Sequence, residues 1–137
     1  MKKIVFISSL ILLSLQSHQA FSGEILDGDA VAKMLVGNTL QMVFRSDTER
    51  SSHLFHEYYD KNGKIYGMER RAETKGNYTH FVGSWEVRDG KFCTSVLGRI
   101  YACHRYEKVD DTTYKLIGER GAYRNVKLYK GKHHIVN

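Results

Sequence analysis

The sequence has 137 residues, with 21 lysine and arginine residues against 15 acidic residues and a net charge of +6 at pH 7. This length fits one domain of ordinary size and excludes an array of domains, and the chain contains no repeats or low-complexity segments. The modest positive charge favours solubility, and it is also compatible with anionic partners such as lipid head groups or polysaccharide.

The start of the chain has the three parts of a secretory signal peptide. Two lysines form a basic start, the run Ile4–Leu15 is mostly apolar, and Ala20 and Ser22 are the small residues expected before a cleavage site. A membrane anchor is the alternative, but a spanning helix needs roughly 20 apolar residues, so we expect no stable membrane insertion. We predict a cleaved signal peptide over 1–22 and a single β-rich domain over 23–137 that is periplasmic or secreted.

The predicted mature domain carries 19 basic against 15 acidic residues, a net charge of +4, because two lysines leave with the signal peptide. We expect no nucleic-acid partner for an exported domain of this kind. Its two cysteines, Cys93 and Cys103, predict a disulfide, because an even cysteine count in an exported chain is typical of one. The bridge would stabilise a small domain with a marginal core by roughly 2–3 kcal/mol.

One short helix is expected at the start of the mature domain. Asp29 is its expected N-cap, and Val31, Met34 and Leu35 form an apolar stripe at helical spacing. Gly37 fits the point at which the helix stops.

The rest of the chain predicts about eight antiparallel strands joined by short turns. The expected strands are 39–44, 52–59, 65–74, 78–87, 91–97, 99–108, 113–118 and 123–129. The dipeptides Asn62-Gly63 and Asp89-Gly90 are the clearest hairpin signals between them. The predicted fold is mainly β, a small lipocalin-like barrel or a sandwich. We favour the barrel, because sequential hairpins need no crossovers and closure hides the sheet edges.

The alternation of the segment 78–87 predicts which of its residues face the core. The inward set is Thr79, Phe81, Gly83, Trp85 and Val87. In the next hairpin, a turn centred on Gly98 places Cys93 directly opposite Cys103, which suits a cross-strand disulfide.

Several short motifs of the mature chain resemble those of a group of small exported bacterial proteins. They are Gly37-Asn38-Thr39-Leu40, Tyr58-Tyr59 followed by Asp60-Lys61-Asn62-Gly63-Lys64, Gly83-Ser84-Trp85, Lys91-Phe92-Cys93 and Cys103. This pattern is similar to the family catalogued as domain of unknown function 995, and it covers most of the mature chain. The resemblance implies a compact, disulfide-bearing periplasmic β-domain, and it supplies no catalytic residues.

A tripeptide provides a second, less favoured resemblance, to periplasmic lysozyme inhibitors, which are also small disulfide-bearing β-barrels. Thr74-Lys75-Gly76 matches their T-K-G segment, but their companion S-G-x-x-Y segment is missing. Lysozyme is usually cationic, as this chain is, so electrostatics oppose such a complex.

Histidine is the first residue type to consider for chemistry, since six histidines remain in the predicted mature domain. A metal site needs three or four ligands converging on one point. His53 and His56 would point to opposite faces of a strand. The weak candidates for metal ligands are His80, His104, His133 and His134. We expect no metal and no cofactor.

Catalytic motifs are missing from the sequence. No serine lies in a G-x-S-x-G segment, both cysteines are assigned to the disulfide, and Asp110-Asp111 falls in an expected turn where acidic residues are common. An enzyme or metal-binding protein with an unrecognised site remains the alternative interpretation.

Tyrosine and arginine are favoured at binding interfaces, and the mature domain contains all nine tyrosines of the chain. The candidate binding face consists of Tyr101, Arg105, Tyr106, Tyr123 and Arg124. Strand packing is the alternative role for most of these tyrosines. The sequence therefore predicts a non-catalytic binding or envelope-accessory domain, whose partner is a small ligand or another envelope protein.

Overall fold

The computed structural model of the chain describes residues 23–45, 52–71, 78–96, 98, 100–118 and 123–133. Within them, helix α1 spans Gly28–Leu35. The strands are β1 (Glu24–Leu26), β2 (Asn38–Arg45), β3 (Ser52–Tyr59), β4 (Lys64–Arg71), β5 (Thr79–Arg88), β6 (Lys91–Ser95), β7 (Ala102–Lys108), β8 (Thr113–Ile117) and β9 (Tyr123–Lys130).

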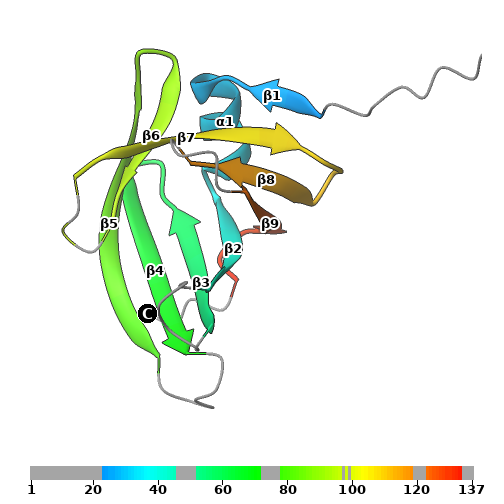
Figure 1. Ribbon diagram of the computed structural model, residues 1–137. Coiled ribbons are helices and arrows are strands. Elements are labelled where there is room, and N and C mark those ends of the chain that lie inside the picture. Colours follow the sequence, from blue (N-terminus) through cyan, green and yellow to red (C-terminus); the bar gives the residue numbers. More distant parts are fainter. Residues whose placement is uncertain are drawn as a thin grey trace, which may run out of the picture.

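Strands β2 to β9 form a closed antiparallel barrel, as Figure 1 shows. Each strand pairs with the next one along the chain, and β9 pairs back with β2 to close the barrel. The predicted fold, one short helix followed by an eight-stranded barrel, is confirmed. Connection by consecutive hairpins explains why the turn signals of the sequence were sufficient to predict it.

One additional strand, β1, was not predicted from the sequence. Leu26 of β1 pairs with Tyr106 of β7, on the edge of β7 that also carries β6. A strand of three residues is too short to show an alternating pattern, and it gains its stability from the barrel strand that it joins.

Helix α1 begins earlier than its sequence suggests. The prediction that Asp29 caps the helix is wrong, because the side chain of Asp27 accepts the hydrogen bond from the backbone N–H of Ala30 at 2.7 Å. Asp29 lies in the first turn, where a negative charge also stabilises a helix. Gly37 follows the last turn with a φ of +82°, a left-handed conformation that favours glycine.

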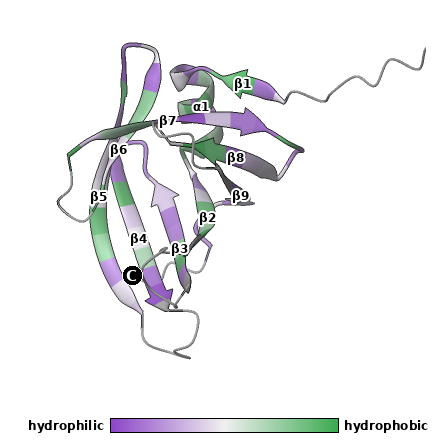
Figure 2. Ribbon diagram, in the orientation of Figure 1, coloured by the Kyte–Doolittle hydropathy of each residue, from purple (hydrophilic) through white to green (hydrophobic). Residues whose placement is uncertain are grey.

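The apolar face of α1 covers one end of the barrel (Figure 1). Val31 and Leu35 are fully buried there and belong to the main core, to which β2, β3, β4 and β6 to β9 also contribute buried residues. In Figure 2, hydrophobic and hydrophilic residues alternate along the strands that enclose this core, as expected for a wall with one buried and one solvated face.

The face assignment within β5 is confirmed for Phe81, Trp85 and Val87, whereas Thr79, at the start of the strand, is exposed. Phe81 is buried, Trp85 and Val87 pack against the core, and Val82 between them is 60% exposed. The ring of Phe92 is at the centre of the core. Its centroid lies 5.5 Å from that of Trp85, 5.7 Å from that of Tyr59 and 6.2 Å from that of Tyr106.

The disulfide and the turns beside it also agree with the sequence-based expectation. Cys93 and Cys103 are direct cross-strand neighbours in β6 and β7, and they are joined by a disulfide. Gly98, in the connection between these strands, has a φ of +70°, a left-handed conformation that favours glycine.

Candidate functional site

A buried acid interrupts the apolar inner wall of the barrel. Glu57 of β3 pairs with Leu40 of β2 on one side and with Gly67 of β4 on the other, so it shares the inward-facing side of the wall. Only 6% of the residue is exposed to solvent. Tyr59, two residues further along the same face, donates a hydrogen bond from its hydroxyl to Oε2 of Glu57 at 2.7 Å.

Tyr106 completes this cluster from β7, and its hydroxyl interacts electrostatically with the hydroxyl of Tyr59 and with the carboxyl of Glu57. The rings of Tyr59 and Tyr106 both pack against Phe92 in the core. Each tyrosine therefore places its apolar ring in the core and its polar end beside Glu57, which is the arrangement expected for buried tyrosines. We call Glu57, Tyr59 and Tyr106 the acid–tyrosine cluster.

Burial changes the acid–base properties of this cluster. It raises the pKa of Glu57 above its ordinary value of 4.5, and the hydrogen bond from Tyr59 opposes that rise. Burial, followed by the nearby charge of Glu57, also raises the pKa of both tyrosines well above the ordinary value of 10.0. The tyrosine hydroxyls therefore stay protonated and available as hydrogen-bond donors.

The inner wall continues beyond Glu57, away from α1, with aromatic side chains. Gly67 has no side chain, and a Cβ there would lie 2.1 Å from the ring of Phe81, so the ring covers this part of β4. The ring of Phe55 meets that of Phe81 edge-on, with their centroids 6.4 Å apart. Further out, His53 stacks on Phe55, and its Nδ1 lies 2.5 Å from Oε1 of Glu69.

These residues form three successive levels along the inner wall: the acid–tyrosine cluster at the edge of the core, the rings of Phe55 and Phe81, and the pair of His53 with Glu69. Strands β3, β4 and β5 supply all of them except Tyr106. Such a wall can bind a molecule that has both an apolar part and a polar or charged group.

We expect Glu57→Gln to raise the melting temperature by a few degrees at pH 7, with little change at pH 4. Because burial raises the pKa of Glu57, the folded protein retains a proton that the unfolded chain releases, and stability falls as the pH rises from about 4.5 to the raised value. Glutamine stays neutral, while its oxygen can still accept the hydrogen bond from Tyr59. Thermal unfolding across this pH range checks the prediction, and an equal gain at every pH would contradict it.

The residues of the predicted binding face are divided between the two sides of the barrel wall. Arg105 is exposed, whereas Tyr106 is 2% exposed and lies in the core. Consecutive residues of a strand point to opposite faces, so these two cannot share one surface. In β9, the backbones of Tyr123 and Arg124 pair with β8, and their side chains lie outside the described part of the structure.

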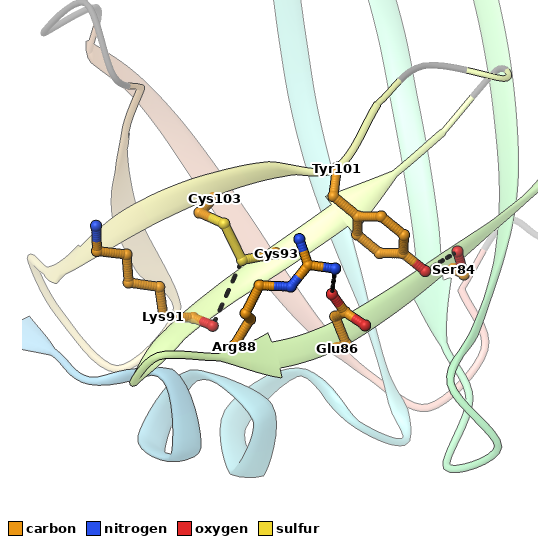
Figure 3. A network of polar contacts seen from close by, with 7 residues as sticks. All are labelled: Ser84, Glu86, Arg88, Lys91, Cys93, Tyr101 and Cys103. Carbon is orange, nitrogen blue, oxygen red and sulfur yellow. Dashed lines mark hydrogen bonds and ion pairs between the residues drawn. A yellow bond between two sulfur atoms is a disulfide. The ribbon is translucent and has the colours of Figure 1, made fainter.

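Tyr101 belongs to a polar network on the outer face of β5 and β6, seen in Figure 3. Its hydroxyl lies 2.6 Å from the hydroxyl of Ser84, and the guanidinium of Arg88 lies 5.3 Å from the centre of its ring. Arg88 also forms an ion pair with Glu86, and the Cys93–Cys103 disulfide lies on the same side of the sheet (Figure 3). The network holds Tyr101 in a defined orientation on the surface.

The candidate metal ligands do not converge in the described part of the chain. His80 is exposed on the outer face of β5, and His104 lies on the inner face of β7 opposite Phe92. His133 stacks on Tyr129 with centroids 4.1 Å apart, and His134 lies outside the described residues. Among the residues that the structure describes, no three His, Cys, Asp or Glu side chains are grouped to hold a metal ion.

The acid–tyrosine cluster was not among the residues predicted from the sequence. The signal for it is the alternation of His53, Phe55, Glu57 and Tyr59 along β3, which places an acid among aromatic residues on one face. An aromatic-rich strand by itself does not indicate which of its faces is buried, so the acid stands out only once the faces are assigned.

The fold and site together define a small disulfide-bearing β-barrel with a buried acid–tyrosine cluster in its inner wall. No family model and no curated protein matches the chain, and the resemblance to domain of unknown function 995 stays a prediction. In the described residues, no helix is long and apolar enough to cross a membrane. The predicted signal peptide and Thr74-Lys75-Gly76 lie outside the described residues.

Proposed function

We propose that this protein is a non-catalytic binding domain that takes a small ligand into the half of its barrel beyond the acid–tyrosine cluster. The observation that carries the proposal is the burial of Glu57 in the inner wall. A buried carboxylate lowers folding stability unless it is well compensated, and a hydrophobic residue at this position would pack against Leu40 without that cost. Ionisable groups with a shifted pKa are concentrated at functional sites.

The surroundings of Glu57 support a ligand rather than a purely structural role. Eight-stranded barrels are wide enough to hold one small ligand. The core adjoining α1 is filled by its own side chains, whereas beyond Glu57 the half-buried residues His53, Phe55 and Glu69 line the wall. An aromatic wall with a few polar groups is typical of small-molecule sites.

The place of action is proposed from the start of the sequence. The basic, apolar and small-residue segments of 1–22 are those of a cleaved signal peptide, so we propose that the domain acts in the periplasm or after secretion. A disulfide such as Cys93–Cys103 persists in those oxidising compartments.

Native mass spectrometry of the full-length precursor, expressed with export to a bacterial periplasm, tests this proposal. We expect a processed, oxidised protein that carries the additional mass of one small molecule, which is released when the protein is denatured. A processed and oxidised protein without additional mass would contradict the proposal.

A second candidate function, binding to another envelope protein, is favoured by the outer network around Tyr101. This residue is held by Ser84 and Arg88, and Arg105 is exposed on the neighbouring strand β7. Rigidly held tyrosine and exposed arginine are typical of protein interfaces. Crosslinking in the envelope, with Tyr101→Ala and Arg105→Ala as variants that lose the crosslink, tests this alternative.

A further inference from the structure

Glu57 uses only part of its capacity for hydrogen bonds. An ionised carboxylate has two oxygens and only accepts hydrogen bonds. Oε2 accepts one from Tyr59, and in the described part of the chain Oε1 accepts none. The residue is nevertheless more than nine-tenths buried. Oε1 is not among the side-chain atoms of the described residues that are both fully buried and without a partner, so this oxygen of the acid can be reached by a small molecule.

Among the side chains that the structure describes, no ion pair includes Glu57. The titratable groups that act on it are the hydroxyls of Tyr59 on its own strand and Tyr106 across the barrel. The nearest ion pair along the inner face of β3 and β4 joins His53 to Glu69 and does not include Glu57. Two acids therefore face inward on this wall, and only one of them has a basic partner among the described side chains.

The side chains of this wall indicate which chemical groups a bound ligand would carry. An ammonium group donates hydrogen bonds and carries the charge that an isolated carboxylate lacks. Aromatic rings, here those of Phe55, Phe81 and Tyr59, attract cations through their faces and also bury an alkyl chain. A ligand carboxylate would instead be repelled by Glu57.

We infer that the ligand is a small amphiphilic amine whose ammonium group binds Oε1 of Glu57 and whose apolar part packs against Phe55 and Phe81. This inference rests on the proposed function, because it names the ligand class of the same site. It goes beyond that function, which requires a small ligand of any charge.

Three probes with the same alkyl chain test the inference on the unmodified protein: n-octylammonium, octan-1-ol and n-octanoate. Because the chain is shared, differences in affinity report the head group. We expect octylammonium to bind about ten- to a hundred-fold more tightly than octanol, the range for a hydrogen bond to a charged group, and octanoate to bind most weakly. Calorimetry measures the affinities, and the fluorescence of Trp85, the single tryptophan of the chain, reports binding inside the barrel.

A matched pair of variants tests whether the preference for octylammonium depends on Glu57. Glu57→Gln should reduce the affinity for octylammonium to that for octanol and leave the affinity for octanol unchanged. Glu86→Gln removes a carboxylate from the outer face of β5 and should leave all three affinities unchanged. If Glu57→Gln fails to fold, as judged by circular dichroism, the order of affinities for the unmodified protein still tests whether the site prefers an amine.

The outcomes separate this inference from the function on which it rests. Equal affinities for octylammonium and octanol, or an octylammonium preference that survives Glu57→Gln, would overturn the amine inference while leaving a ligand-binding barrel. Failure of every probe to bind, together with an exported protein that carries no additional mass, would overturn the proposed function and the inference with it.

Discussion

Phe92→Ala is expected to lower the free energy of unfolding by about 3–5 kcal/mol, the usual cost of removing a buried phenylalanine ring. Phe92 is 1% exposed, and its ring packs against Tyr59, Trp85 and Tyr106. The variant would leave a cavity where residues from β3, β5, β6 and β7 meet. Urea unfolding followed by circular dichroism measures the effect.

Val82→Ala is the control for this prediction, because Val82 lies on the outer face of β5 and is 60% exposed. It should change the free energy of unfolding by less than about 0.5 kcal/mol, as is usual for surface positions. A loss below about 1 kcal/mol for Phe92→Ala would mean that the barrel interior can collapse around the missing ring, and it would contradict a close-packed core around Phe92.

The second large effect is expected from the disulfide. Replacing both cysteines, Cys93→Ser with Cys103→Ser, should lower stability by roughly 2–3 kcal/mol, because the bridge restricts the unfolded chain over a loop with a sequence separation of 10 residues. Changing both residues avoids leaving a free thiol. The effect is measured as a decrease in the midpoint of urea unfolding.

Chemical reduction of the unmodified protein provides the matched control for the double variant. The reduced protein and the double serine variant should unfold at similar urea concentrations, since both lack the same covalent link. An unchanged midpoint in both would show that the link between β6 and β7 contributes nothing to stability, and the predicted loss would then be wrong.

The barrel could be predicted from the sequence because each of its hairpins is indicated by residues that are close together in the chain. Asn62-Gly63 and Asp89-Gly90 occupy turns with positive φ at Gly63, Asp89 and Gly90, and each turn joins strands that pair with each other. The pairing of Cys93 with Cys103 is likewise centred on a glycine, Gly98. The sequence does not identify the helix cap, because Asp27 and Asp29 are chemically equivalent candidates and only the geometry of the first turn distinguishes them.

The candidate site depends on contacts that no local pattern contains. Tyr106 and Arg105 looked alike as members of a Tyr- and Arg-rich segment, yet the pleat of β7 places them on opposite faces. Glu57 resembles any surface acid until it is known that Leu40 and Gly67 are its neighbours and that Tyr106 reaches the cluster from across the barrel. Barrel closure brings these residues together, and closure is a property of the whole chain.

Whether the barrel interior holds the ligand is tested by comparing two variants at adjacent positions of β2. Met42 packs on the inner face opposite Phe55, whereas Val43 is on the outer face and 55% exposed. Native mass spectra of the exported proteins should show the small-molecule adduct in Val43→Trp and in the unmodified protein, but not in a folded Met42→Trp. An adduct that persists in Met42→Trp and disappears in Val43→Trp would place the ligand outside the barrel and contradict a binding site in its interior.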